Sequence, residues 1–257
     1  MGAFNQKAIN TFGLNNINMS IDSPSISFDE RFSKLTTYLD MQVIFKNVLP
    51  RLPKQFRENP CILDVGAGKG RMTRKFVEIA KRVVAIEPFE PFYQVLSVSC
   101  SAKNLETYQC ALLEYKKIAK YLFDIIYISG VSPYLDDDEF VEFMSEVNTL
   151  LQPWGIVCVR ERGTFRKLSI RSSSEILRTP YEISLVAEKT GFSLIQLNRA
   201  YPIIFPWIYY QRYPNRFSRT LYNMATLECF FSLWSILPKI NLNYSSGVFW
   251  VYLLSKM

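Results

Sequence analysis

Short apolar runs alternate with amphipathic segments through the middle of the chain. Between the runs, apolar side chains return every three or four positions, as they do on one face of a helix. The apolar runs predict strands at residues 61–65, 82–87, 107–111, 123–129, 156–161, 192–200 and 248–254. The intervening segments predict helices at residues 70–80, 91–101, 113–120, 136–151 and 180–189. Continuous apolar strands that alternate with helices indicate an α/β fold with a mostly parallel sheet covered on both faces.

The remaining segments lack this alternation. Residues 1–26 are rich in Asn, Ser and Ile without a sustained period, which predicts a poorly ordered arm. Ser27 and Glu30 have the spacing of a capping box, so we expect a helix from there to Pro50. An insert rich in aromatic residues and proline precedes the last strand. The expected parts are the arm 1–26, a domain 27–201, the insert 202–247 and a final strand 248–257 of the same domain.

The composition is that of an ordinary globular protein, because 49% of the 257 residues are hydrophobic and 21% are charged. Thirty Lys and Arg against 23 Asp and Glu give a net charge of +7. Such a charge favours an anionic partner if it is concentrated, and only solubility if it is spread evenly. It gathers between residues 160 and 178, where six basic residues face two acidic ones.

The cysteines indicate a reducing compartment. All five are widely spaced without a Cys-x-x-Cys pair, and the chain has no histidine, which argues against disulfide scaffolds and zinc sites. The N-terminus lacks the pattern of a secretory signal. The longest apolar stretch, residues 224–237, contains Glu228 and is shorter than the ~20 residues that span a bilayer. We therefore expect a cytoplasmic protein without a transmembrane segment.

The first predicted strand leads directly into a glycine-rich turn. Asp64 stands at the strand end, and Gly66, Gly68 and Gly70 follow at alternating positions. Glycines allow a sharp turn and let a ligand lie against main-chain N–H groups. A dinucleotide fingerprint would need a sixth-place glycine where Arg71 stands, and a P-loop would need Ser or Thr in place of Gly70. The pattern Asp-x-Gly-x-Gly-x-Gly instead resembles the S-adenosylmethionine (SAM) loop of the class I methyltransferases.

This resemblance implies a Rossmann-like sheet of seven strands with an antiparallel last strand, a lid helix before the first strand, and SAM as cofactor. Asp64 would order the loop or meet the SAM ammonium, and Arg71 would reach the SAM carboxylate unless it is merely solvated. Glu87, at the end of the second strand, would take the ribose hydroxyls. Main-chain groups near Leu112 and Leu113 would bind adenine. The expected cofactor-binding residues are Asp64, Gly66, Gly68, Gly70, Arg71, Glu87, Leu112, Leu113 and Ser129.

Residues 61–160 are locally similar to the protein α-N-terminal methyltransferases. The shared patterns are Gly-Ala-Gly-x-Gly-Arg-x-Thr at 66–73, Cys-x-Leu-x-acid-aromatic at 110–115 and Tyr-Leu-Asp-Asp at 134–137. That family binds its substrate amine with Asn and Asp. Past Glu161 the similarity ends, and the arginines Arg160, Arg162 and Arg171 occupy the region.

The acceptor side is expected after the fourth and fifth strands. Tyr134 and Glu161 are the predicted catalytic residues, since Tyr134 can orient a nucleophile and Glu161 can help where no histidine exists. Tyr134 could instead be an aromatic residue that only covers the strand. Arg162, Arg171 and Arg178 are predicted to bind phosphate or carboxylate on the substrate, with a solvated basic loop as the alternative. The acids at 136–138 are explained by helix capping, so we expect no metal.

The combined hypothesis is methyl transfer from SAM to an oxygen or nitrogen of a small-molecule or glycan-like acceptor, either anionic or lipid-linked. The tyrosines, tryptophans and arginines of residues 202–237 suit peripheral membrane contact, although a lid, a dimer face or core packing would explain them too. Alternatives are a protein or nucleic-acid N-methyltransferase, a non-catalytic SAM-binding partner protein and an NAD-dependent reductase. Nucleic acid is disfavoured because no Asn-Pro-Pro-Tyr-type loop follows the fourth strand.

Overall fold

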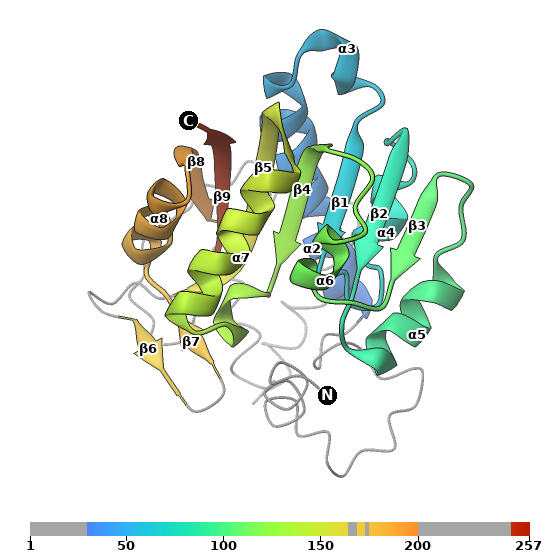
Figure 1. Ribbon diagram of the computed structural model, residues 1–257. Helices are drawn as coiled ribbons and strands as arrows, with labels where there is room; N and C mark the ends of the chain where they lie inside the picture. The colour runs from blue at the N-terminus through green and yellow to red at the C-terminus, as the bar shows by residue number, and fades with distance from the viewer. Residues whose placement is uncertain (1–29, 164–168, 173–174, 200–247) are drawn as a thin grey trace, which may run out of the picture.

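The computed structural model describes residues 30–163, 169–172, 175–199 and 248–257. Seven strands form one sheet in the order β3-β2-β1-β4-β5-β9-β8 (Figure 1). Their bounds are β1 (Cys61–Val65), β2 (Arg82–Ile86), β3 (Leu105–Tyr108), β4 (Phe123–Ser129), β5 (Leu151–Gly163), β8 (Phe192–Arg199) and β9 (Val248–Lys256). Strands β1 to β5 are parallel, and β9 is antiparallel to both of its neighbours. The predicted fold class is thereby confirmed.

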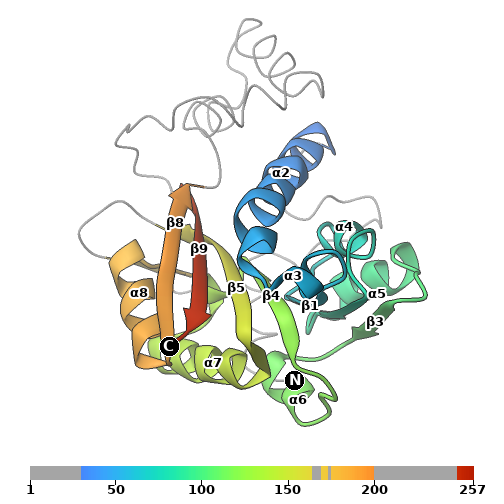
Figure 2. The ribbon, with the colours of Figure 1, turned by 90° about the horizontal axis from the view of Figure 1, so that it is seen from above.

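Helices cover both faces of the sheet (Figure 2). Their bounds are α2 (Glu30–Val43), α3 (Lys54–Arg57), α4 (Thr73–Phe76), α5 (Glu90–Ser99), α6 (Leu112–Lys116), α7 (Asp137–Leu150) and α8 (Pro180–Lys189). One core cluster joins α2 and α4 to the sheet through residues such as Leu39, Phe76 and Ile62. A second cluster joins α6, α7 and α8 to the opposite face.

Strand β1 shows why the apolar runs are continuous. Ile62 packs toward α2 and α4, whereas Leu63 and Val65 pack into the cluster of α6, α7 and α8. Successive side chains of a strand point to opposite faces, so a strand covered on both sides needs apolar residues at nearly every position. Asp64 is the polar exception, and it is buried.

Element bounds differ from the predictions where the pattern is weak. Strand β3 pairs with β2 from Leu105 to Tyr108 rather than over 107–111, because its alternating, half-buried sequence lacks a continuous apolar run. Helix α2 passes into a π-helical turn at Ile44–Val48 and a 3₁₀ turn at Leu49–Arg51. A short hairpin of β6 (Ile170–Arg171) and β7 (Ile176–Leu177) lies within the basic segment, where no strand was predicted.

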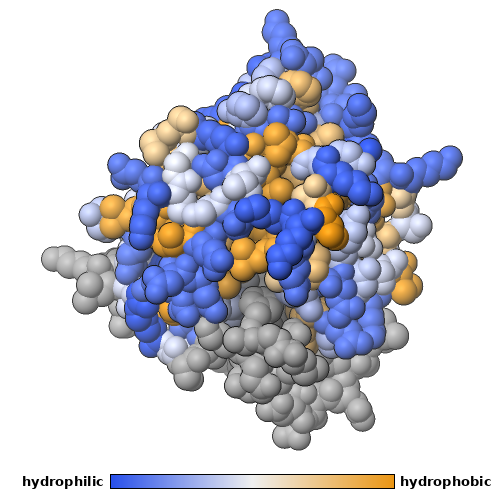
Figure 3. All heavy atoms as spheres, viewed as in Figure 1, coloured by the Kyte–Doolittle hydropathy of each residue, from blue (hydrophilic) through white to orange (hydrophobic). Residues whose placement is uncertain are grey.

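Two predicted parts lie outside the described residues, namely the arm 1–26 and the insert 202–247, as does Ser27 of the predicted capping box. Within the described ranges, every helix is too short or too polar to cross a membrane. The face seen in Figure 3 is largely hydrophilic, with apolar residues showing between the hydrophilic ones. Such a surface is ordinary for a globular protein.

Candidate active site

The glycine turn after β1 is hydrogen-bonded to the end of β2. The N–H groups of Gly66 and Ala67 both donate to the carbonyl oxygen of Ile86, at 3.0 Å each. The backbone then passes through the left-handed region at Gly66, Gly68 and Gly70, with φ of 68°, 58° and 81°. Residues other than glycine rarely adopt this conformation, so the alternating glycines are a requirement of the backbone path.

The three glycines differ in what a side chain would meet. A Cβ atom on Gly66 would lie 2.6 Å from Val131, and one on Gly70 would lie 2.5 Å from the sulfur of Cys100. A Cβ atom on Gly68 would have no protein atom within 4 Å. Packing therefore excludes side chains at Gly66 and Gly70, whereas the main chain at Gly68 borders open space.

Glu87 lies beside this turn, just past the end of β2. Its Oε2 accepts a hydrogen bond from the Gly68 N–H at 2.8 Å, and its Oε1 accepts one from the Phe89 N–H at 2.9 Å. The residue is 5% exposed, and burial raises the pKa of its carboxyl to about 7 against the opposing effect of these two bonds. A carboxylate has about four acceptor sites, so two remain for other donors. The structure thus brings together Glu87 and Gly68, two of the predicted cofactor-binding residues.

Asp64 connects β1 to the segment after the turn. Its Oδ2 accepts a hydrogen bond from the Thr73 hydroxyl at 2.6 Å. Burial raises the pKa of the Asp64 carboxyl to about 6, and the Thr73 bond partly opposes this rise. Of the two predicted roles, these contacts favour ordering of the loop. The predicted helix at 70–80 is regular only over α4.

Arg71 is bound to helix α2. Its Nη2 donates to Asp40 at 2.7 Å, and its Nη1 donates to the Thr37 hydroxyl at 3.2 Å. Asp40 also accepts a hydrogen bond from Nε of Arg160 at 3.1 Å, and Arg160 donates to the Ser129 hydroxyl at 3.1 Å. The predicted residues Arg71 and Ser129 thus belong to one polar cluster with Asp40 and Arg160 at the ends of β4 and β5.

Sequence reasoning missed Asp40. The available signal was its position on the buried stripe that runs along α2 into the π-helical turn, where Thr36, Asp40 and Ile44 follow at four-residue spacing. An acidic residue is rarely buried unless it is paired, so an acid within such a stripe indicates a partner from elsewhere in the chain.

Leu112 and Leu113 occupy the first two positions of α6. Leu112 is buried and Leu113 is exposed at the surface. The first N–H groups of a helix have no acceptor within the helix, so the main chain here can donate to a ligand. The preceding residue, Ala111, donates its own N–H to Glu114 Oε2 at 2.8 Å.

Glu161 lies fully buried near the end of β5. Its Oε1 accepts hydrogen bonds from the N–H groups of Val131 and Ser132, both at 3.0 Å. Burial raises the pKa of the Glu161 carboxyl to about 7. Among the described residues, Glu161 Oε2 and the Tyr252 hydroxyl are buried side-chain atoms without a hydrogen-bond partner. These contacts show Glu161 holding the loop that follows β4.

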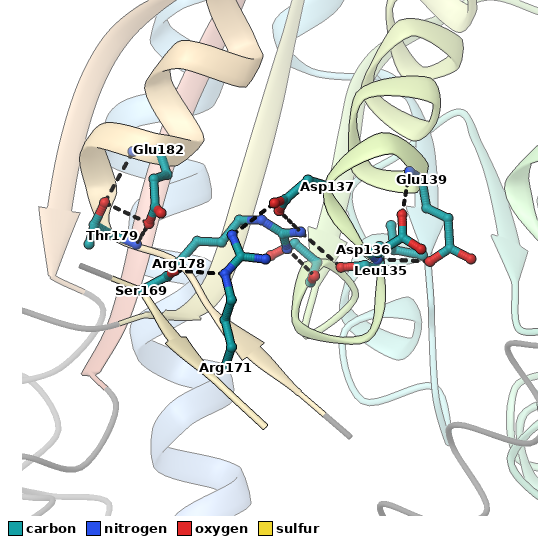
Figure 4. A network of polar contacts seen from close by, with 10 residues as sticks. Leu135, Asp136, Asp137, Glu139, Ser169, Arg171, Arg178, Thr179 and Glu182 are labelled. Carbon is teal, nitrogen blue, oxygen red and sulfur yellow. Dashed lines mark hydrogen bonds and ion pairs between the residues drawn. The ribbon is translucent and has the colours of Figure 1, made fainter. Parts of the chain in front are cut away.

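Arg178 holds the same loop from its carbonyl side, as Figure 4 shows. The guanidinium donates to the carbonyl oxygens of Ser132 at 2.6 Å and Leu135 at 2.8 Å, and to Asp137 at 2.9 Å. It also lies 4.7 Å from the ring centroid of Phe140, and Arg178 is only 2% exposed. Arg178, which was predicted to bind substrate, thus donates its hydrogen bonds to the protein's own loop and to Asp137.

The other two predicted substrate-binding arginines are more exposed. Arg171 donates to Asp137 at 2.8 Å and to the Ser169 hydroxyl at 3.2 Å, and its side chain is 49% exposed (Figure 4). Arg162 pairs with Glu175 at 2.9 Å. Burial raises the pKa of the Tyr134 hydroxyl; Glu175 adds to the rise and Arg162 opposes it. Tyr134 therefore remains protonated at neutral pH.

The acids before α7 have capping and pairing roles. Asp136 accepts the Glu139 N–H at 2.9 Å, and Glu139 accepts the Asp136 N–H at 2.8 Å, which forms a capping box. Asp137 lies between Arg171 and Arg178, which lower the pKa of its carboxyl against the opposing effect of burial. The predicted capping of this helix is confirmed.

Comparison with known proteins shows which family the chain matches. The model of a family described as AdoMet dependent proline di-methyltransferase matches residues 39–204, which is more than half of the chain. A Danio rerio protein, N-terminal Xaa-Pro-Lys N-methyltransferase 1, is 29% identical over 139 residues, covering 52% of this chain and 62% of the relative. The chain spans 62 to 65% of the length of the first curated relatives it matches.

Solved structures share the fold. A SAM-dependent methyltransferase of Leishmania major superposes with a TM-score of 0.57 at 14% identity, covering 88% of this chain and 72% of that one. The 1,6-didemethyltoxoflavin-N1-methyltransferase of Burkholderia thailandensis, solved with S-adenosylhomocysteine, gives a TM-score of 0.53 at 15% identity, covering 88% and 86%. At these identities the likeness concerns the fold alone.

The order of the seven strands, with β9 antiparallel to both of its neighbours, defines a class I SAM-dependent methyltransferase fold. The chain belongs to the AdoMet dependent proline di-methyltransferase family. SAM is the cofactor of that family.

Proposed function

We propose that the protein transfers a methyl group from SAM and that the donor lies against Gly68 and beside Glu87. The observation that carries this proposal is the open space at Gly68, where a Cβ atom would meet no protein atom within 4 Å. Packing does not demand a glycine there, and the site lies at the carboxyl ends of β1 and β2, the edge at which open α/β sheets bind ligands. The residues present therefore fit an adenosyl ligand.

Each donor-side residue has a role in this proposal. Glu87 accepts the ribose hydroxyls with its remaining acceptor sites, and the main chain at Leu112 and Leu113 meets the adenine edge. Arg71 takes the carboxylate, and Ser129 faces the methionine part. SAM supplies a methyl group already activated by its sulfonium charge, so the protein mainly aligns the acceptor and excludes water.

We place the acceptor beyond the loop after β4, with Tyr134 orienting its nucleophile. Since the pKa of Tyr134 is raised, its hydroxyl acts as a hydrogen-bonding group rather than as a base. Glu161 and Arg178 act as positioning residues that hold the N–H and C=O groups of this loop. This role replaces the general-base role that the sequence suggested for Glu161, because a fully buried carboxyl bonded to two N–H groups is poorly placed to meet an acceptor.

The acceptor class we propose is a small or glycan-like molecule with an anionic group, methylated on oxygen or nitrogen. Arg162 and Arg171 support it, because both are partly exposed and their ion pairs with Glu175 and Asp137 can exchange for a ligand anion at small cost. A lipid-linked acceptor with membrane contact through residues 202–237 is an extension of this proposal. The cysteine pattern supports a cytoplasmic location.

Methylation of protein N-termini is the second candidate. The family description and the name of the Danio rerio relative favour it. A cationic peptide N-terminus would call for unpaired acids on the acceptor side. There, Asp137 stays paired with the buried Arg178 even when Arg171 leaves it, and Glu161 is bonded to main-chain N–H groups. This charge distribution is why we rank the anionic acceptor first.

Turnover of labelled SAM tests both candidates. The full chain is incubated with methyl-labelled SAM and, separately, with phosphorylated or carboxylated small molecules and glycans, peptides that begin Xaa-Pro-Lys, and total RNA. Gly68→Asp serves as the inactive control. Labelled anionic product supports the first proposal, and labelled peptide alone supports the second. SAM binding without S-adenosylhomocysteine formation would indicate a non-catalytic protein, and absence of SAM binding by calorimetry would overturn the donor assignment.

A further inference from the structure

We infer that Asp40 is a positioning residue through which docking of helix α2 is coupled to binding of the donor's amino-acid part. This inference rests on the proposed function, because it assigns the coupled ligand as SAM. Asp40 touches no substrate atom in this scheme. It acts through two arginines, Arg71 and Arg160.

The geometry is a carboxylate shared by two guanidinium groups. Oδ2 of Asp40 lies 2.7 Å from Nη2 of Arg71, and Oδ1 lies 3.1 Å from Nε of Arg160. The Asp40 side chain is 2% exposed, against 26% for Arg71 and 10% for Arg160. Each oxygen thus has its own arginine in a largely desolvated setting, where charge-assisted hydrogen bonds are strong.

The two arginines come from different parts of the donor edge. Arg71 directly follows the glycine turn, and Arg160 lies in β5, where it donates to the Ser129 hydroxyl at the end of β4. Asp40 comes from α2 and is the contact by which that helix is tied to both. A single side chain therefore connects three elements that meet where we place the methionine part of the donor.

Arg71 is the more exposed of the two arginines in this cluster. Its side chain is 26% exposed, against 10% for Arg160. A guanidinium has five N–H donors, and the two bonds from Arg71 to α2 use only part of them, so Arg71 can bind a second carboxylate beside Asp40. The α-carboxylate of SAM or S-adenosylhomocysteine is such a group.

Helix α2 sets the conformation of Arg71 by two contacts one turn apart. Besides Asp40, the Thr37 hydroxyl accepts from Nη1 of Arg71 at 3.2 Å. Leu39 and Met41 pack the same helix against the sheet. If α2 moved away, Arg71 would lose both contacts. Coupling is reciprocal, so a ligand that needs Arg71 in this place stabilises the docked helix.

Two ligands that differ in the amino-acid part measure the coupling between α2 and that part of the donor. S-adenosylhomocysteine carries the amino-acid part, and 5′-methylthioadenosine keeps the adenosine and lacks that part. We expect Asp40→Asn to weaken S-adenosylhomocysteine roughly tenfold, within the usual range of coupling between sites, and to change 5′-methylthioadenosine by less than about twofold. Isothermal calorimetry on the full chain measures both. Gln42→Ala, on the same helix, is the control and should change neither affinity.

Hydrogen exchange supplies a second readout that does not depend on affinity. In the wild-type protein, S-adenosylhomocysteine should slow amide exchange in residues 36–43, and 5′-methylthioadenosine should not. Asp40→Asn should remove this protection, and Asp40→Glu should restore part of it. If Asp40→Asn fails to fold, Thr37→Val removes one Arg71 contact at nearly constant shape and should weaken S-adenosylhomocysteine alone, by about threefold.

The outcomes distinguish a failure of the role assigned to Asp40 from a failure of the proposed donor site. Equal weakening of both ligands, or of neither, would overturn the role of Asp40 while leaving the donor site intact. Unchanged exchange of α2 on addition of S-adenosylhomocysteine would overturn it as well. A wild-type protein that binds neither ligand would remove the proposed function and this inference together.

Discussion

Gly68 and Gly70 illustrate how two glycines of one turn differ in purpose. Gly68→Asp should abolish SAM binding, because a side chain would enter the space that we assign to the donor. The effect on folding should be limited to the strain of left-handed backbone, about 1 to 2 kcal/mol, because no protein atom lies near that Cβ and Asp tolerates this conformation better than most residues. Gly70→Ala should instead lower the melting temperature through collision with Cys100 and Leu96. Calorimetry and thermal melts measure the two effects, and unchanged SAM affinity in Gly68→Asp would refute the loop assignment.

Glu87 should make SAM binding dependent on pH. Its pKa of about 7 means that the carboxyl is largely protonated at pH 6 and ionised at pH 8. The ionised form accepts hydroxyl hydrogen bonds, so SAM affinity should rise between these pH values. Glu87→Ala should weaken SAM by roughly 1 to 3 kcal/mol, the scale of hydrogen bonds to charged groups. Calorimetric titrations of SAM at both pH values measure this change in affinity. Glu87→Gln should remove most of the pH dependence. If SAM affinity in Glu87→Gln depended on pH as much as in the wild type, another group would be responsible.

Among single residues, the local sequence pattern identified the glycines and Glu87 as candidate site residues, and it missed Asp40. The glycines and Glu87 are recognisable from their places at strand ends. Asp40 acquires its role from Arg71 and Arg160, which lie 31 and 120 positions further along the chain. Spacing in the sequence carries no information about such a contact. The same reason explains why Arg178 looked like a substrate ligand until its carbonyl partners were visible.

Among the elements, the loop between β4 and α7 should depend strongly on Arg178. Arg178→Met would leave the carbonyl oxygens of Ser132 and Leu135 without their donor, at a cost of roughly 3 kcal/mol for the lost charged hydrogen bonds. We expect a melting temperature lower by about 6 to 12 °C. The turnover number should fall by a larger factor than the KM for SAM changes, because we place the acceptor beside this loop.

Arg171→Met is the matched control for this prediction. Arg171 also pairs with Asp137, but its side chain is 49% exposed, so its loss should cost less than about 1 kcal/mol. Thermal melts on both variants make the comparison of stability, and steady-state kinetics on Arg178→Met measure the turnover number. Equal destabilisation of the two variants would contradict the proposal that Arg178 holds the loop between β4 and α7.

The accuracy of the predicted elements followed the strength of their patterns. Strand β4 was predicted with its observed bounds, because seven mostly apolar residues leave little choice. The hairpin of β6 and β7 was missed, since two strands of two residues each produce no period. Its position beside the loop of Arg178 depends on contacts between distant segments.

For the whole molecule, three buried acids should make the folded state less stable as the pH rises. The pKa values of Asp64, Glu87 and Glu161 are raised to about 6, 7 and 7 from ordinary values of 3.8, 4.5 and 4.5. A raised carboxyl pKa means that the folded state binds the proton more tightly. The stability from these groups is therefore fully present below about pH 4 and is lost as the pH rises through 7.

Urea unfolding at pH 5 and pH 7.5 measures this effect in the absence of ligand. We expect the contribution of these groups to lower the free energy of unfolding at the higher pH. Glu161→Gln should reduce the difference between the two pH values, whereas Glu142→Gln, at an exposed position on α7, should leave it unchanged. An unaltered pH dependence in Glu161→Gln would show that Glu161 does not titrate in this range.

The sequence by itself determined the order along the chain of the seven strands of the main sheet and of the helices between them, the mostly parallel character of the sheet and the position of the glycine turn after β1. Each of these depends on local features: apolar periodicity, turn residues and the residue type at a strand end. Only the tertiary structure decided that Asp40 ties α2 to Arg71 and Arg160, and that Glu161 and Arg178 hold one loop from two sides. These assignments depend on which charged side chains meet after burial, and desolvated charges select their partners by proximity in space rather than by spacing in the chain.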